Sequence, residues 1–274
     1  MTEHYIPSSD GTRLAVRDLG KRDARPIVFI HGYLFSSDAF AGQFLGRLKD
    51  DYRLISLDLR GHGRSEKPLD SAAYGDRKVW ADDVAYVLDA LDVERALLVG
   101  WSLGSRVAVN YGSIYGLDRV AGFNLVTTVV ARAPQPPSST TPAQLRDLTS
   151  PDLEVRRAAT RWFIEACAAP HVFDPEQLDA FVATSMETPL AARRANTSWY
   201  VGYADFLPRI SAPLLVTHGA EDRFTPEAAS RTLADAVPSA TLSMFAETGH
   251  LPFIQRPERF NDELAGLAAR VFDH

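Results

Sequence analysis

The chain has 274 residues, of which 46% are hydrophobic and 23% charged, and its formal net charge at pH 7 is −6. This acidic balance argues against a nucleic-acid-binding face, which needs a basic surface. No apolar run approaches the roughly 20 residues of a membrane-spanning helix, and the N-terminus has no signal-peptide pattern. The single cysteine, Cys167, excludes an intramolecular disulfide and is expected to be a buried thiol. We therefore expect a cytoplasmic globular protein with no nucleic-acid or membrane partner.

Predicted strands and helices alternate along most of the chain. Segments 5–7 and 13–16 flank an Asp-Gly turn, which indicates a β-hairpin. Apolar residues at three- and four-residue spacing predict helices over 80–91, after residue 104 and over 260–271. Further strands are expected at 26–30, 53–58, 96–99, 120–126, 213–217 and 240–244. Such alternation predicts an α/β fold with a doubly wound, mostly parallel sheet.

Residues 128–206 interrupt this alternation. A Pro/Ser/Thr-rich stretch at 134–142 is followed by two helical patterns, at 155–166 and 178–185. One alternative is that these helices only complete the cover of the sheet. A single crossover between parallel strands, however, needs only about a dozen residues or somewhat more. We therefore predict an α/β core over 1–127 and 207–274, with a helical lid inserted at 128–206.

Residues 100–104 read Gly-Trp-Ser-Leu-Gly and join a predicted strand to a predicted helix. In this position the Gly-x-Ser-x-Gly pattern is typical of the nucleophile elbow of serine hydrolases. Side chains in place of Gly100 and Gly104 would collide with the neighbouring strand and helix in so tight a turn. Ser102 is therefore the predicted nucleophile. A pattern this short also occurs by chance, so the assignment depends on partners elsewhere in the chain.

A serine hydroxyl needs a base within hydrogen-bond reach to act as a nucleophile at neutral pH. Of the seven histidines, His250 lies in a loop after the last predicted strand. Active-site groups of parallel sheets gather at that carboxyl edge. A carboxylate must then orient the imidazole. We predict Asp222, which follows the strand at 213–217, in preference to Glu221 and Glu247.

The oxyanion that forms during acyl transfer must also be held. Two backbone N–H groups are predicted for this role, those of Tyr33 and Leu103. Leu103 begins a predicted helix, where the helix dipole favours negative charge. The side chains of Tyr33 and Leu103 are then free to shape the pocket.

The substrate pocket is expected between the sheet and the lid. A mostly apolar wall would favour short or medium acyl esters or aromatic esters over charged substrates. The residues predicted to bind substrate are Leu34, Trp101, Trp162 and Leu251, with Phe35, Phe163, Trp199 and Phe224 as further candidates.

Taken together, these stretches make the chain similar to the α/β-hydrolase superfamily over nearly its full length. The resemblance rests on residues 29–32, 58–65, 100–104, 218–222 and 249–250, and on the chain order Ser102, Asp222, His250. Within the superfamily the chain most resembles serine carboxylesterases and cofactor-free haloperoxidases, which are perhydrolase-like esterases. Dehalogenases and epoxide hydrolases carry an aspartate in place of Ser102, so their chemistry is not expected. Perhydrolases often carry Phe before and Met or Thr after the serine, where this chain has Trp101 and Leu103.

The resemblance implies an enzyme that cleaves small-molecule carboxylic esters through an acyl-serine intermediate. No metal-ligand spacing occurs, and we expect neither a metal nor an organic cofactor. A lactonase, a carbon–carbon bond hydrolase or a perhydrolase could use the same triad. A non-enzymatic ligand receptor on this fold is a further alternative. The physiological ester and the oligomeric state are left open by the sequence.

Overall fold

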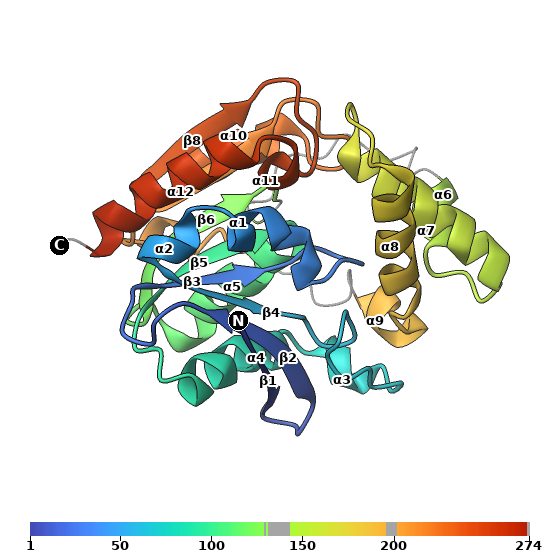
Figure 1. Cartoon of the computed structure of the whole chain (residues 1–274), viewed down its shortest axis with the longest axis horizontal. Helices are drawn as coiled ribbons and strands as arrows, with labels where there is room; N and C mark the ends of the chain where they lie inside the picture. The colour runs from blue at the N-terminus through green and yellow to red at the C-terminus, as the bar shows by residue number, and fades with distance from the viewer. Residues whose placement is uncertain (129, 131–142, 196–201, 273–274) are drawn as a thin grey trace.

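An eight-stranded sheet forms the centre of the computed structural model, which describes residues 1–128, 130, 143–195 and 202–272 (Figure 1). The strand order is β1-β2-β4-β3-β5-β6-β7-β8. β1 pairs antiparallel with β2 and β2 with β4, whereas the pairs from β4 to β8 are parallel. This arrangement confirms the predicted α/β fold. The strands are β1 (Thr2–Pro7), β2 (Arg13–Leu19), β3 (Pro26–Ile30), β4 (Arg53–Leu57), β5 (Ala96–Trp101), β6 (Val120–Val126), β7 (Leu214–Gly219) and β8 (Ala240–Phe245).

Helices cover both faces of this sheet. A Cβ atom on Gly122 of β6 would meet Val271 of α12, whereas Phe123 reaches Gly112 of α5. Because successive strand residues point to opposite faces, α12 and α5 lie on opposite sides. The helices outside the β6–β7 connection are η1 (Ser37–Phe40), α1 (Ala41–Leu45), α2 (Leu48–Asp51), α3 (Ala72–Gly75), α4 (Arg77–Ala90), α5 (Leu103–Tyr115), α10 (Glu227–Ala236), α11 (Pro252–Gln255) and α12 (Pro257–Phe272).

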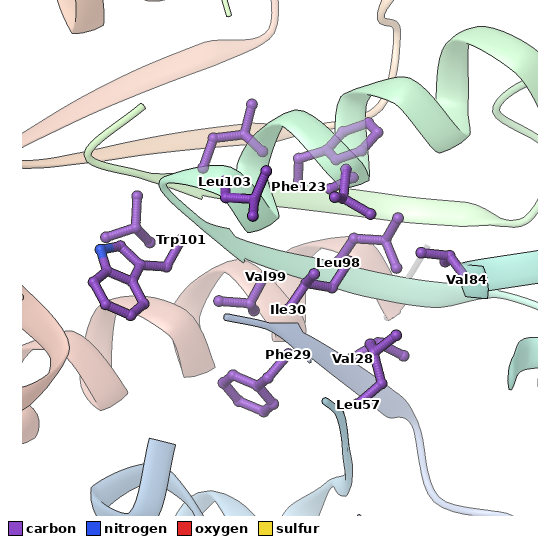
Figure 2. Close-up of a cluster of buried hydrophobic side chains, with 14 of the residues drawn as sticks. Val28, Phe29, Ile30, Leu57, Val84, Leu98, Val99, Trp101, Leu103 and Phe123 are labelled. Atoms are coloured by element: carbon purple, nitrogen blue, oxygen red, sulfur yellow. The ribbon is translucent and has the colours of Figure 1, made fainter. Parts of the chain in front are cut away.

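The hydrophobic core explains why the central strands read as continuous apolar runs. Every residue of β4, β5 and β6 is buried, as expected for strands covered on both faces. Figure 2 shows side chains from these strands packed with Val84 of α4 and Leu103 of α5. Leu103 directly follows Ser102, so this packing fixes the start of the helix that carries the candidate nucleophile.

Among the described residues between β6 and β7 there are the short η2 (Leu207–Arg209) and four α-helices, which gather beside the sheet (Figure 1). The four α-helices are α6 (Ala143–Asp147), α7 (Leu153–Ala168), α8 (Pro175–Met186) and α9 (Leu190–Ala195), called here the inserted helices. The side chains of Asp152 and Asp174 accept hydrogen bonds from the first-turn N–H groups of α7 and α8, which satisfies otherwise unpaired donors. Both predicted helical patterns fall within α7 and α8. The predicted stretch at 134–142 lies outside the described residues.

None of the helices in the described ranges is long and apolar enough to cross a membrane.

Candidate active site

Ser102 lies at the sharp turn between β5 and α5, with φ 53° and ψ −110°. A positive φ in a residue other than glycine costs on the order of 1–3 kcal/mol and is found where surrounding structure enforces it. Here the neighbours enforce it by close approach. A Cβ atom would lie 2.6 Å from the Gly104 carbonyl oxygen if added to Gly100, and 2.0 Å from that of Ile30 if added to Gly104. Both glycines are therefore required by the turn.

The imidazole of His250 contacts the carboxylate of Asp222, with 2.7 Å between Nδ1 and Oδ2. Both side chains are buried, with 4% and 0% exposed. The other carboxylate oxygen of Asp222 accepts from the N–H groups of Phe224 at 2.8 Å and Thr225 at 3.2 Å. Because an ionised carboxylate only accepts, Nδ1 carries the imidazole proton, and Nε2 of a neutral His250 is free to accept one.

The two competing carboxylates lie elsewhere. Glu221 is exposed, and its backbone N–H donates to the Thr248 carbonyl at 2.9 Å. Glu247 is also exposed and pairs with Arg256 at 3.3 Å. Asp222 is thus the residue of these three that holds His250.

The loop that carries His250 is tied to the nucleophile turn through its backbone. The carbonyl oxygen of His250 accepts from Nε1 of Trp101 at 2.8 Å and from Oγ1 of Thr127 at 3.1 Å. Oγ1 of Thr225 in turn donates to the Thr127 carbonyl at 3.1 Å. The end of β5 and the segments following β6 and β7 are therefore joined to the His250 loop. The roles of Thr127 and Thr225 were not predicted, because a hydroxyl that bonds a backbone group leaves no sequence pattern.

The same loop is also docked on the inserted helices. The His250 N–H donates to the Cys167 carbonyl at 3.2 Å. Oε1 of Gln255 accepts from the Gly249 N–H at 2.7 Å, and its amide nitrogen donates to the Ala168 carbonyl. Cys167 is buried, as predicted, and burial raises the pKa of its thiol. Gln255 was also missed by the sequence analysis, where its only signal is a polar residue five positions after His250.

Three other buried histidines have local hydrogen-bond partners. His31 accepts the Leu59 N–H on Nε2 at 2.9 Å, and Nδ1 of His218 lies 2.9 Å from Oγ of Ser230. Nδ1 of His62 lies 3.0 Å from the Arg60 carbonyl. Burial lowers the pKa of all three, that of His62 to about 3. These imidazoles are neutral at physiological pH and brace loops.

Two backbone N–H groups in segments that form or adjoin the nucleophile turn have no acceptor within the residues that the structure describes. They belong to Tyr33 and to Leu103, the first residue of α5, and both residues are buried. Unpaired buried N–H groups are rare in proteins. The loop that carries Tyr33 lies against the nucleophile turn, since a Cβ atom on Gly32 would be 3.0 Å from the Trp101 ring. Both donors are available to a negatively charged oxygen, and the Leu103 N–H has the added benefit of the helix dipole.

Residues 27–263 match the alpha/beta hydrolase family. The chain belongs to this family. Membership makes it a hydrolase of the α/β-hydrolase fold that acts on a small-molecule substrate.

Individual relatives of this hydrolase carry esterase and haloperoxidase names. It is 31% identical to a non-heme chloroperoxidase from Streptomyces lividans, over 94% of this chain and 97% of that protein. It is 28% identical to a bifunctional esterase/perhydrolase from Acinetobacter calcoaceticus, over 95% and 97% of the two chains. A crystal structure of a putative aryl esterase from Burkholderia cenocepacia superimposes with a TM-score of 0.92 at 31% identity, over the full length of both chains.

The predicted pocket residues of the hydrolase differ in exposure. Leu34, Trp101 and Leu251 are at most 1% exposed, so they occupy core positions around the site. Trp162 is partly exposed, and its ring lies 6.1 Å from that of Phe224. The Phe224 ring in turn lies 5.4 Å from the His250 imidazole and 5.0 Å from the Phe163 ring. Trp199 lies outside the described residues.

In the part of the chain that the structure describes, no three His, Cys, Asp or Glu side chains are grouped closely enough to hold a metal ion.

Proposed function

We propose that this hydrolase cleaves small carboxylic esters through a covalent acyl-serine intermediate. In this proposal Ser102 is the nucleophile, His250 the general base and acid, and Asp222 the group that orients His250. The N–H groups of Tyr33 and Leu103 form the oxyanion hole. The observation that carries the proposal is the 2.7 Å contact between Asp222 and His250, in a loop hydrogen-bonded to the turn that presents Ser102.

The first half-reaction transfers the acyl group to the enzyme. Nε2 of His250 takes the hydroxyl proton as Oγ of Ser102 attacks the ester carbonyl carbon. The carbonyl π-electron pair moves to oxygen, where the N–H groups of Tyr33 and Leu103 stabilise the charge. As the tetrahedral intermediate collapses, the bond to the alkoxy oxygen breaks. His250 gives its proton to that oxygen, and the alcohol leaves.

Water completes the cycle in the second half-reaction. His250 takes a proton from water as the water oxygen attacks the acyl carbon, and the same oxyanion hole holds the new intermediate. Collapse breaks the bond to Oγ of Ser102, and the proton on His250 passes to that oxygen. The carboxylic acid is released, and the enzyme returns to its starting state. Asp222 stabilises the imidazolium in both halves.

The inserted helices are proposed as part of a lid, residues 128–206, that covers this site. The rings of Trp162, Phe163 and Phe224 form a chain of contacts that reaches the His250 imidazole. Aromatic and apolar surfaces of this kind favour uncharged acyl or aryl groups. The similarity to a putative aryl esterase supports the same substrate class. We therefore propose esters of short acyl chains or of phenols as substrates.

A second candidate is perhydrolysis, in which hydrogen peroxide replaces water in the second half-reaction and a peracid is released. The names of the two curated relatives reported above favour it. Measuring peracid formation from acetate and hydrogen peroxide beside ester hydrolysis separates the two activities. Peracid turnover above ester turnover would make perhydrolysis the main reaction.

The proposal is tested by hydrolysis of nitrophenyl esters of graded acyl length. Ser102→Ala should lower kcat by at least roughly 10,000-fold with the folded structure retained. Ser113→Ala is the matched control, because Ser113 lies on the same helix and its hydroxyl donates to the Asn110 carbonyl one turn back, at 2.8 Å. Near-parental turnover in Ser102→Ala would overturn the proposal.

A further inference from the structure

Two side-chain hydrogen bonds join the loop after β3 to the inserted helices. The hydroxyl of Tyr33 donates to the Arg193 carbonyl on α9 at 2.9 Å. The hydroxyl of Ser185, on α8, donates to the Leu34 carbonyl in a hydrogen bond shared with the Phe181 carbonyl of the same helix, at 2.7 Å. The bonds to the Arg193 and Leu34 carbonyls are buried, and each links residues more than 150 positions apart in the sequence. The Tyr33 hydroxyl therefore faces the inserted helices, while its N–H remains free for the oxyanion.

The loop itself holds a strained conformation. Leu34 is fully buried and has φ 63°, in the left-handed region that favours glycine. The loop's own hydrogen bonds converge on the Gly32 carbonyl, which accepts the Phe35 N–H at 3.3 Å and lies 2.7 Å from Nδ1 of His31. A backbone in a sparsely populated conformation persists only where its surroundings over-determine it. The two bonds from the inserted helices supply that external constraint on either side of the Tyr33–Leu34 peptide.

The acceptor of the Tyr33 hydroxyl is held in turn by the side chain of its own residue. Arg193 is 2% exposed, so its guanidinium is buried. Its hydrogen bonds reach the segment after α6, the middle of α7 and the end of α8. The Arg193 backbone is therefore held in place by contacts with three of the inserted helices and their connections. The guanidinium donates at 2.6 to 3.2 Å to the carbonyl oxygens of Leu148, Ser185 and Thr188 and to Oγ1 of Thr160.

We propose that the Tyr33 hydroxyl is a positioning group for the oxyanion hole. Its bond to the Arg193 carbonyl holds the Tyr33 backbone N–H where the transition-state oxygen forms. The inserted helices thereby contribute to transition-state stabilisation as well as covering the site. This inference rests on the proposed function, in which the Tyr33 N–H is one of the two oxyanion donors.

The test is Tyr33→Phe, which removes one hydroxyl and keeps the ring that packs on Phe163 and His62. Misplacing a donor should cost less than deleting it, so we expect kcat for a nitrophenyl ester to fall about 10- to 100-fold. The KM should stay within about twofold, because the ground-state ester carries no full charge on its oxygen. Affinity for a phenylboronic acid, which forms a tetrahedral adduct, should fall by a similar factor to kcat.

Tyr74→Phe is the matched control, since Tyr74 is also buried and its hydroxyl donates to a backbone carbonyl, that of Pro68, at 2.8 Å. It should change kcat and boronate affinity by less than twofold, even if it lowers the Tm as much as Tyr33→Phe does. A purely structural role of Tyr33 would make the two variants alike. Parental kcat and boronate affinity in Tyr33→Phe would overturn the inference and leave the proposed function intact.

Ser185→Ala removes the second bond and decides the question if Tyr33→Phe fails to fold. It should lower kcat and boronate affinity together while leaving KM within about twofold. Unchanged kcat in a folded Ser185→Ala protein would then overturn the inference. Parental turnover that survives Ser102→Ala would overturn the proposed function, and this inference with it.

Discussion

Glu221 and Asp222 are neighbours in sequence, yet only the Asp222 carboxylate turns toward the His250 imidazole. Its second oxygen is held by the N–H groups of Phe224 and Thr225, which fixes the direction of the first. The preference for Asp222 could be formed from its place after a strand. The contacts that aim it could not, because they are made by backbone groups of any residue type.

At this scale we predict that Asp222→Asn lowers kcat for ester hydrolysis by roughly 1000- to 10,000-fold. An amide can donate to Nδ1, which would place the imidazole proton on Nε2 and block its role as a base. The measurement is the steady-state rate on a nitrophenyl ester. Glu221→Gln makes the same change from carboxylate to amide at the preceding residue and should leave the rate within about twofold. Equal losses in the two variants would contradict the assignment of Asp222.

At the scale of elements, the predicted strand at 120–126 matches β6 residue for residue, whereas the strand predicted at 96–99 extends to Trp101. The sequence reading assigned residues 100–104 to the turn. In the structure Trp101 still pairs with Val126, so the sheet continues up to Ser102. Apolar patterning locates strand interiors well. It misses the end of β5, where the backbone pairing with β6 continues through Gly100, a residue without a side chain.

Two helical glycines allow a matched test of how closely α5 packs against the neighbouring strand at the nucleophile turn. Gly266 of α12 has open space where a Cβ atom would lie, so Gly266→Ala should raise the free energy of unfolding by about 0.5–1 kcal/mol. At Gly104 of α5 the same atom would lie 2.0 Å from the Ile30 carbonyl oxygen, so Gly104→Ala should destabilise the fold and abolish activity. Urea unfolding measures the stability of both variants, and hydrolysis of a nitrophenyl ester measures their activity. A Gly104→Ala protein as stable and active as the parent would contradict the tight turn.

Across the whole molecule, the contacts of the inserted helices are the part that the sequence did not predict. Helical periodicity located α7 and α8 but carries no information about which loops they touch. The docking of Cys167 on His250 and of Arg193 on Tyr33 joins residues far apart in the chain. Such contacts depend on how two separately folded layers fit, which short-range patterns do not encode.

The buried neutral histidines make a prediction for the stability of the whole fold. Burial lowers the pKa of His31, His62 and His218 below the value of 6.5 that applies when the chain is unfolded. The unfolded state therefore binds more protons below pH 6.5, and stability falls as the pH drops. With the pKa of His62 at about 3, its share of the loss at pH 5 is about 2 kcal/mol.

Urea unfolding at pH 7.5 and pH 5 checks this, with His62→Gln as the comparison. The glutamine side chain does not titrate, and its amide can still donate to the Arg60 carbonyl. We expect the loss of unfolding free energy between the two pH values to shrink by about 2 kcal/mol in the variant. An equal loss in both proteins would show that His62 takes up no proton on unfolding.

The most direct measurement of the central claim is intact-protein mass spectrometry after rapid acid quench during turnover of a slowly deacylated nitrophenyl ester. We predict a mass increase of one acyl group, located by peptide mapping on the peptide that carries Ser102. The adduct should be absent from Ser102→Ala and present in Ser113→Ala. Full turnover with no acyl adduct, or an adduct on another residue, would contradict the account.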